Sequence, residues 1–409
     1  MSSSTQLLRN VFVRTILISN ALSQLGIWIR NFAVLLYVME RTGGNALAVS
    51  LISVAEYAPI FVFSFIGGVL ADRWRPKRTM FWCELLSALS VFIVFLVLES
   101  GSWEAVFCAT LCSSLLSQLA QPSGMKLFKV HVQYEDAPAC MSLLQTLFSI
   151  FMIMGPVLGT YVYQGWGIGL ALLLTSVSFL LSALVLLFIA PDKEQQPIRQ
   201  EEVPPSLLRE MAEGIRYIAA RKDLLSLNIC LMIVGLGVGL ITPLSMFLVT
   251  ERLGLTAQHL QWITIPYGAG EIIGGIATFL LAARIAPQRL IMIGLAANGA
   301  GILLVGMSTS LGMAMLAQFF IALLQPAIFV GNTSLVMQRT EPAYIGRVSG
   351  IRTPLMTGAM LLTMSCSGIL KDALSLEWVY VWAGLCFWAG LLLMLRPLPL
   401  AENEEPSAH

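Results

Sequence analysis

Long apolar runs alternate with short charged segments along the whole chain. A helix of about 20 apolar residues crosses the roughly 30 Å hydrocarbon core of a bilayer. Counting the apolar runs between charge clusters predicts twelve such helices. Their expected ranges are 12–38, 45–71, 79–98, 103–125, 141–163, 167–190, 224–250, 259–283, 289–308, 310–337, 347–370 and 376–395. The pattern therefore predicts an all-α integral membrane protein with many spans.

The longest polar segment, residues 191–223, divides the chain into two sets of six spans. It begins with DKEQQPIRQEEVPP, whose composition is typical of a flexible linker. In the following stretch Leu208, Met211, Ile215 and Ile218 recur at a spacing of three to four residues, which predicts an amphipathic helix on the membrane surface. The expected units are a first six-helix bundle at 1–190, a linker at 191–223, and a second six-helix bundle with a short tail at 224–409.

The two halves contain matching sequences. ADRWRPKR at 71–78 follows the second predicted span, and AARIAPQR at 282–289 follows the eighth. Gln121-Pro122 in the fourth span is echoed by Gln325-Pro326 in the tenth. Parallel repeats related by an axis along the membrane normal are a known transporter design, so two pseudo-symmetric bundles are expected.

Composition narrows the function classes. The 409 residues are 57% hydrophobic and 11% charged, whereas soluble domains average about 25% charged residues. The sequence has no nucleotide-binding loop, no HExxH and no CxxC, and its three histidines are scattered. We therefore expect no enzyme activity, no cofactor, no metal site and no nucleic-acid partner. A transporter-like sensor would be expected to carry an additional soluble domain.

The basic residues predict the orientation. If the N-terminus is placed in the cytoplasm, 20 of the 24 Lys and Arg residues fall on the cytoplasmic side, Arg352 among them, and three fall outside. Cytoplasmic loops of membrane proteins carry such an excess of positive charge. Both termini are thus expected in the cytoplasm, in a multi-pass protein of a cell membrane, most simply the bacterial plasma membrane.

Four ionisable residues fall inside predicted spans, where each is costly and therefore a functional candidate. Arg30 and Glu56 lie at similar depth on neighbouring spans, so they form either a structural ion pair or, for Glu56, a proton-carrying site. Glu271 has no intramembrane partner in its own half and is the better proton-coupling candidate. Glu84 is close enough to the interface that a solvated or latch residue is expected.

Amides and hydroxyls form stripes on predicted spans one, four and ten, which indicate a polar cavity or hydrogen bonds between packed helices. Trp28, Tyr57, Trp262 and Tyr267 could stack on a large organic substrate or fill packing gaps. The candidate cavity residues are Asn20, Gln24, Arg30, Asn31, Gln118, Gln121, Asn228, Gln318, Gln325 and Asn332.

The stretch IGGVLADRWRPKR resembles the loop 2–3 motif of the major facilitator superfamily, and GPVLGT at 155–160 resembles its antiporter motif. REMAEGIRYI at 209–218 and PAYIGRVSGI at 342–351 are similar to the branch that holds macrolide-efflux proteins and siderophore exporters. The resemblance implies a cytoplasmic gate at Asp72, Arg73 and Arg78, and an antiporter motif at Gly155, Pro156 and Gly159. Ser113 stands where the family usually has a span-four Arg.

The resemblance implies the major facilitator fold and a secondary active exporter that works by alternating access. Inward proton movement would drive out an amphipathic organic compound: a drug, a macrolide-like compound or a siderophore. The alternative is a lysophospholipid or lipid transporter of the same superfamily. The implied partners are the small-molecule substrate, protons and the bilayer, and a monomer is the superfamily expectation.

Overall fold

The computed structural model describes residues 10–73, 75–99, 104–131, 137–189, 207–282, 284–341 and 344–395, and all regular elements there are helices. The first half contains α2 (Val11–Arg41), α3 (Ala46–Arg73), α4 (Pro76–Glu99), α5 (Ala105–His131) and α6 (Ala137–Leu186). After the linker come α7 (Leu207–Ala220), α8 (Lys222–Ile241), α9 (Ser245–Phe247), a π-helical turn η1 (Leu248–Arg252) and a 3₁₀ turn η2 (Ala257–His259). The remaining helices are α10 (Leu260–Ala282), α11 (Pro287–Gly306), α12 (Leu311–Arg339), α13 (Ile345–Leu374) and α14 (Leu376–Leu395).

These helices confirm the predicted spans. Ten of the described helices are long and apolar enough to cross a membrane, and α5 contributes a shorter apolar stretch at 105–120. One of the ten, α6, holds two spans, because Gly167 interrupts it with a φ of 76° and a ψ of −175°. Only glycine adopts such a backbone readily, which makes Gly167 the hinge between spans five and six.

Two local features depart from simple spans. The predicted seventh span, 224–250, is divided into α8, α9 and η1 because Pro243, two residues after the end of α8, has no N–H to continue its hydrogen bonding. The internal repeat reappears as structure: α4 begins at Pro76 and α11 begins at Pro287, the equivalent prolines of the two matching loops. Proline is favoured in the first turn of a helix, where its missing N–H costs nothing.

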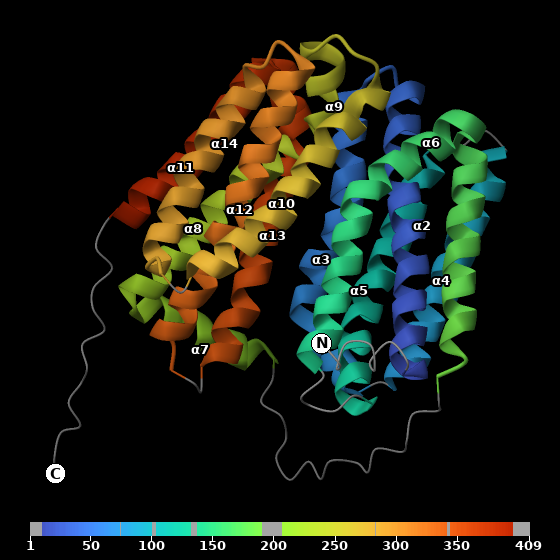
Figure 1. The fold of residues 1–409 in the computed structure, drawn as a ribbon, viewed down its shortest axis with the longest axis horizontal. Coiled ribbons are helices and arrows are strands. Elements are labelled where there is room, and N and C mark those ends of the chain that lie inside the picture. The colour runs from blue at the N-terminus through green and yellow to red at the C-terminus, as the bar shows by residue number, and fades with distance from the viewer. Residues whose placement is uncertain are drawn as a thin grey trace.

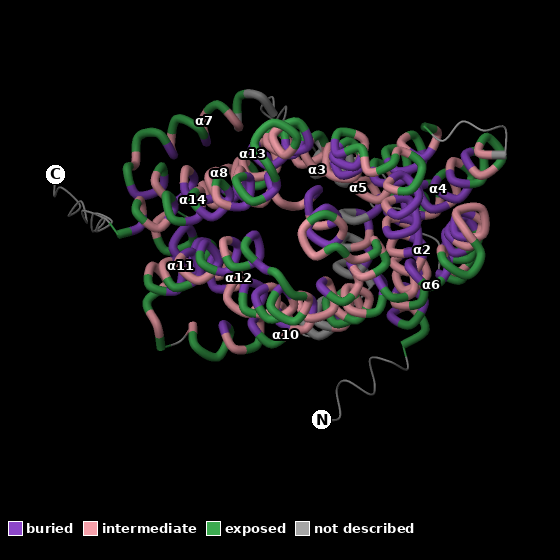
Figure 2. The backbone as a smooth tube through the Cα atoms, turned by 90° about the horizontal axis from the view of Figure 1, so that it is seen from above, coloured by how far each residue is buried: buried purple, intermediate pink, exposed green. Residues whose placement is uncertain are grey.

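The helices form two bundles that meet at one end and diverge toward the other (Figure 1). We call the end that carries α7 and the beginning of α2 the linker side, and the end that carries η1 and η2 the distal side. The first bundle contains α2–α6 and the second contains α8–α14 (Figure 2). This confirms the predicted twelve helices in two six-helix bundles.

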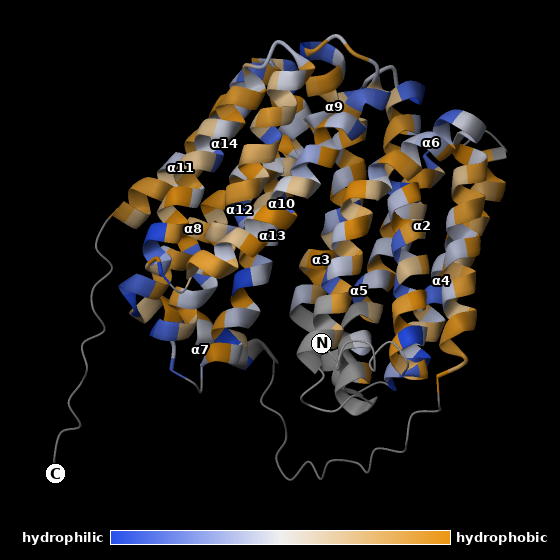
Figure 3. Ribbon diagram, in the orientation of Figure 1, coloured by the Kyte–Doolittle hydropathy of each residue, from blue (hydrophilic) through white to orange (hydrophobic). Residues whose placement is uncertain are grey.

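The lateral surface is apolar, and hydrophilic residues gather near both ends of the bundles (Figure 3). Phe188, Phe279 and Leu392 are 79%, 78% and 66% exposed, respectively, on this surface. In water such exposure would be an aggregation liability, whereas lipid solvates it. The molecule is thus built as a multi-pass membrane protein.

The described contacts between bundles extend from the distal side to the middle of the helices. Helix α3 packs against α13, with the Ser50 and Ser367 hydroxyls 3.1 Å apart. A Cβ on Gly368 would lie 2.6 Å from the backbone of Ala46, so this glycine lets the two helices touch. Helix α6 packs against α10 near Gly268, which lies against Ile153. The two bundles are therefore closed at the distal side.

Helix α7 packs on the linker side of the second bundle, against α13 and α8. Its Tyr217 ring stacks on Tyr344 at 4.1 Å between centroids. Its Glu213 pairs with Arg347 at 3.3 Å, and Arg221, which follows it, pairs with Glu341 at 3.0 Å. These contacts attach the helix to the turn between α12 and α13.

Candidate functional site

Two carboxylates from opposite bundles meet around a pair of tyrosines. Glu56 and Tyr57 lie on α3, and Tyr267 and Glu271 lie on α10. Tyr57 is close enough to interact electrostatically with both Glu56 and Glu271, and Tyr267 interacts in the same way with Glu271 and Tyr57. The Tyr267 hydroxyl donates a hydrogen bond to Gln325 Oε1 on α12 at 3.0 Å. We call these five residues the central site.

The first bundle supplies the central site with a buried cation. Arg30 on α2 is 1% exposed, and its guanidinium donates to Asn31 Oδ1 from Nε at 3.0 Å and from Nη2 at 2.8 Å. Asn31 Nδ2 in turn donates to Glu56 Oε1 at 2.6 Å. Arg30 and Glu56 therefore interact through an amide. Because an isolated buried charge is very costly, this network gives each charged group a compensating partner.

Ser113 on α5 completes the network, since its hydroxyl oxygen accepts from Arg30 Nη1. The resemblance to the major facilitator superfamily implied an Arg at this point of span four. In this chain the position holds a serine, which accepts from the guanidinium on α2 and donates to the Ala109 carbonyl of its own helix.

Glu271 has a different environment. It is half-buried on α10, and no hydrogen bond or ion pair to its carboxylate is found among the described residues. A carboxylate that is partly removed from water and has no fixed donor is free to exchange a proton. The two acids of the central site therefore differ: Glu56 is held in a network and Glu271 is not.

The second bundle has its own cation, Arg352. This residue fell inside the predicted span 347–370 but was counted with the cytoplasmic positive residues, and the structure places it within α13 (Ile345–Leu374), where it is half-buried. Its Nη2 donates to Asn332 Oδ1, and Asn332 Nδ2 donates to the Leu227 carbonyl at 3.1 Å. Arg352 Nε is buried and has no partner among the described residues. The polar stripe on span ten, which includes Asn332, was the sequence signal that pointed to this contact.

The other predicted cavity residues are placed as follows. Asn20, Gln24, Gln118 and Gln318 are half-buried side chains on α2, α5 and α12. Asn228 is 3% exposed, and its Nδ2 donates to the Leu224 carbonyl of its own helix at 2.8 Å. The amide of Asn228 thus bonds within α8, and its Oδ1 is buried without a partner among the described residues. The side chain of Gln121 lies outside the described residues.

The antiporter-like motif is a packing site in α6. A Cβ on Gly155 would lie 2.5 Å from ring carbons of Trp28, and one on Gly159 would lie 2.7 Å from Cβ of Phe32. Pro156 lies between them inside the helix. The two glycines let α6 approach α2, the helix that carries Arg30 and Asn31, as small residues do between membrane helices.

The predicted gate is only partly described. Helix α3 ends at Arg73, but the side chains of Asp72 and Arg73 lie outside the described residues. Arg78 is exposed in the first turn of α4. The gate function of these three residues stays a prediction.

Glu84 is not the solvated residue that its position suggested. It is 8% exposed inside the first bundle, and Ser23 Oγ donates to its Oε1 at 2.7 Å. The expectation of a solvated Glu84 is wrong because it considered only depth along α4, whereas the packing of α2 and α6 around α4 decides exposure. A latch role for Glu84 stays a prediction.

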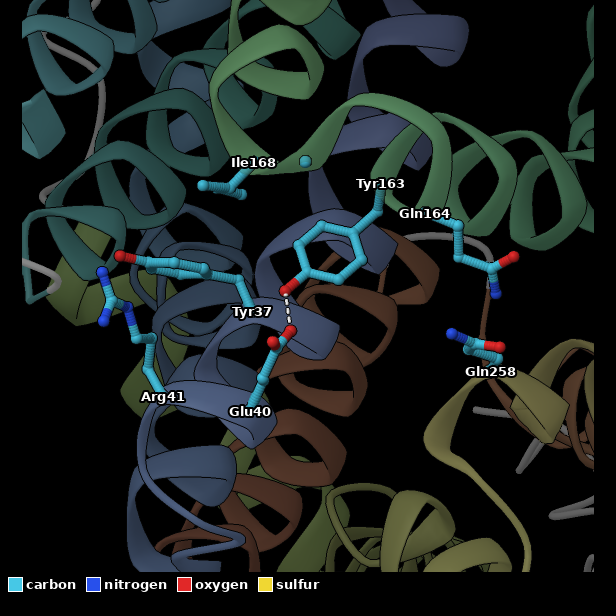
Figure 4. Close-up of a pocket in the computed structure, with 8 residues that line it drawn as sticks. Tyr37, Glu40, Arg41, Tyr163, Gln164, Ile168 and Gln258 are labelled. Carbon is cyan, nitrogen blue, oxygen red and sulfur yellow. Dashed lines mark hydrogen bonds between the residues drawn. The ribbon is translucent and has the colours of Figure 1, made fainter.

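A concave pocket of about 680 Å³ lies at the distal side, between the two bundles (Figure 4). Tyr163 donates a hydrogen bond to Glu40 Oε2 at 2.5 Å, and the Arg41 guanidinium lies 5.7 Å from the centre of the Tyr37 ring. Gln258 from the second bundle closes the opposite wall. None of these residues was a sequence candidate, because the signal used was polarity inside spans and these residues lie at span ends.

Comparisons with known proteins place this architecture in a family. A family model described as Major Facilitator Superfamily matches residues 16–286 and 227–409. The MFS-type transporter YkuC of Bacillus subtilis is 28% identical over 390 residues, which cover 92% of this chain and 90% of YkuC. Macrolide efflux protein A of Streptococcus pyogenes is 24% identical over 385 residues, which cover 90% of this chain and 92% of that protein.

A solved structure agrees at the level of the fold. A mutant of the nucleoside transporter NupG superposes with a TM-score of 0.78, covering 94% of this chain and 99% of its own, at 13% sequence identity. Similarity at that identity concerns the arrangement of helices and says nothing of the substrate.

Proposed function

Because the chain belongs to the Major Facilitator Superfamily, and is a membrane transporter rather than an enzyme, we propose that it is a proton-coupled exporter working by alternating access. The observation that carries the proposal is the central site, where Glu56 and Glu271 come from opposite bundles to one pair of tyrosines. A site shared by two moving halves allows proton binding and substrate binding to bias the same rearrangement.

Glu271 is the proposed principal proton carrier. No hydrogen bond or ion pair of its carboxylate is found among the described residues, so its protonation breaks no such contact. Glu56 is the proposed second coupling residue. Protonation of Glu56 would weaken the hydrogen bond that Asn31 donates to it and leave Arg30 without an opposing charge. Both changes would alter the contacts of α2, which carries Arg30 and Asn31. Loss of a buried counter-charge is expensive, so such a change can drive helix movement.

The proposed substrate is an amphipathic organic compound. Tyr57 and Tyr267 offer ring faces, and amides offer hydrogen bonds, a combination that suits large neutral or cationic molecules. The name of the Streptococcus pyogenes relative favours a macrolide-like compound among the drugs and siderophores considered. The amides proposed to line its path are Asn20, Gln24, Asn31, Gln118, Gln121, Asn228, Gln318, Gln325 and Asn332, with Arg30 at the edge.

The proposed transport cycle uses the two bundles as its moving parts. We take residues 1–190 and 224–409 as the halves, 191–223 as their linker, and the linker side as cytoplasmic. Closure at the distal side supports an inward-facing state as the starting point. Asp72, Arg73 and Arg78 would latch the linker side in the opposite state, and Gly155, Pro156 and Gly159 would keep α6 packed on α2. One protein chain is proposed to suffice.

The proposal is tested in everted membrane vesicles, energised to an acid interior and read with a pH-sensitive dye. Cationic dyes, macrolides and iron-free siderophores are added one at a time. We expect one class to release protons from vesicles with the wild-type chain, and the release to be lost with Glu271→Gln. Glu377→Gln, a change at an exposed distal residue that pairs with Arg252, serves as the matched control.

Silence with every class, from correctly oriented and folded protein, would contradict a drug exporter and direct attention to lipid substrates. Equal proton release by Glu271→Gln and wild type would contradict the assigned coupling role while leaving export intact.

A further inference from the structure

A cluster of oxygen atoms lies inside the first bundle, away from the central site. Glu84 on α4 is surrounded by Ser19 and Ser23 on α2 and Ser182 on α6. Ser19 Oγ and Ser182 Oγ are 2.7 Å apart, and Ser182 Oγ and Ser23 Oγ are 2.9 Å apart. Ser23 donates to Glu84 Oε1 at 2.7 Å, so three hydroxyls form a chain that ends on the carboxylate.

The cluster is sealed. The four residues are between 0% and 8% exposed. An apolar layer separates them from the linker side; its buried members are Val13, Ile16, Met80, Leu127, Cys140, Leu186 and Ile189. A carboxylate in such surroundings is strongly disfavoured in its charged form unless a cation or several donors compensate it.

The protein compensates the charge of the Glu84 carboxylate only in part. Glu84 Oε2 is buried and has no hydrogen-bond partner among the described residues, and the ion pairs found there do not include Glu84. On the packed helices, the titratable neighbour is Cys83, a buried thiol beside Glu84 on α4. The sequence has no titratable residue on α2 between Arg14 and Arg30, on α5 between Cys112 and Lys126, or in the second span of α6.

We propose that the Ser19, Ser23, Ser182 and Glu84 cluster is a binding site for one monovalent cation, a proton or a sodium ion. Hydroxyl groups can accept as well as donate, so the same chain can solvate the empty carboxylate or coordinate a cation held on Oε2. An all-oxygen set is the type that hard cations prefer. The site goes beyond the proposed coupling through Glu271 and Glu56, and it lies on the opposite side of the molecule's first bundle from α10.

Occupancy has a direct structural consequence. Ser19 and Ser23 lie one turn apart on α2, the helix that also carries Asn20 and Gln24. A cation coordinated by the carboxylate and the serine hydroxyls would reorient Ser23, which donates to Glu84 Oε1 in its absence, and so change how α2 packs on α4 and α6. Binding at this cluster is therefore expected to change the position of a helix that borders the proposed substrate path.

The test uses the full-length protein in lipid nanodiscs, without substrate and in sodium-free choline buffer. Infrared difference spectra between low and high pH report the carbonyl stretch of protonated carboxylic acids. We expect a band that decreases as the pH rises in the wild type and in Glu104→Gln, a change at an exposed residue before α5. In Glu84→Gln this component is expected to be absent.

A second arm separates the two cations. Sodium chloride is added at constant pH, with potassium chloride as the control. A sodium site is expected to lose the protonated band and to gain thermal stability with sodium in the wild type and not in Glu84→Gln. A proton site is expected to give the same protonated band and the same thermal stability with and without sodium. Spectra of Glu84→Gln that superimpose on those of wild type at every pH, with no effect of sodium, would overturn the proposal.

If Glu84→Gln does not fold, Ser182→Ala retains the carboxylate and removes one hydroxyl. We expect it to shift the pH at which the band disappears, and an unchanged midpoint would overturn the proposal. Because no transport is measured, these results are independent of whether Glu271 couples export to protons.

Discussion

Gly274 on α10 is predicted to be the least replaceable glycine of the second bundle. A Cβ at this position would lie 2.1 Å from the Leu323 carbonyl oxygen and 2.6 Å from its carbonyl carbon on α12. Both are backbone atoms, so no side-chain rotation can relieve the overlap. The helices would have to separate along their contact.

The next residue provides a matched control. A Cβ on Gly275 would have no neighbour within 4 Å, although both glycines lie in the same helix. Overpacking of a close contact costs about 1–3 kcal/mol. Alanine is the better helix former by about 1 kcal/mol at either position, so this gain cancels when the two variants are compared. We therefore expect Gly274→Ala to be less stable than Gly275→Ala by about 1–3 kcal/mol, the cost of overpacking.

The assay is equilibrium unfolding of the two purified variants and the wild type in the same mixed micelles, followed by tryptophan fluorescence. The predicted order of unfolding free energy is Gly275→Ala, then wild type, then Gly274→Ala. Equal stability of the two variants would refute the close packing of α10 on α12 and, with it, the placement of Tyr267 beside Gln325.

Three further predictions concern the network, the distal closure and the linker helix. Arg30→Met is expected to lose about 1–3 kcal/mol of stability, because Asn31 Oδ1 loses its donor and the half-buried Glu56 loses its opposing charge. The double variant with Glu56→Gln should recover most of this loss in the same unfolding assay, and additive losses would contradict the pairing. In a background without native cysteines, the double variant Ser50→Cys and Ser367→Cys is expected to form a disulfide across the 3.1 Å contact. The disulfide should stop transport until reductant is added. Normal transport by a verified cross-linked protein would contradict opening of the distal side during the cycle. Tyr217→Ala removes a ring stack of about 0.5–1.5 kcal/mol, so hydrogen exchange in α7 should accelerate while that in α10 does not change.

Much of the fold could be predicted because bilayer thickness and helix rise together fix the length of a span. The apolar runs therefore gave all twelve helices, and the repeated proline loops identified equivalent positions of the two halves. Gly167 separates spans five and six where the predicted ranges 141–163 and 167–190 meet. What could not be predicted was an event inside a run, the break of the seventh span after α8, because it does not change the local hydropathy.

The sequence predicted which residues form the site better than it predicted the contacts between them. An ion pair between Glu56 and Arg30 was one of two alternatives, and the two residues interact through Asn31. The bridging role of Asn31 depends on its side-chain conformation, which sequence spacing does not determine. Glu84 and Arg352 were assigned by their depth along one helix, whereas their environments depend on the packing of neighbouring helices. The distal pocket at Tyr163 requires two bundles to come together, which no local pattern reports.

The measurement that tests proton-coupled export most directly uses proteoliposomes with the wild-type chain or Glu271→Gln and a labelled macrolide. Two modes are compared: exchange of substrate without a pH gradient, and accumulation against a substrate gradient driven by a pH gradient. We predict that Glu271→Gln retains exchange and loses accumulation, because alternating access persists when the proton site is permanently neutral. Retention of driven accumulation by Glu271→Gln would contradict the central claim that protons enter the cycle at this residue.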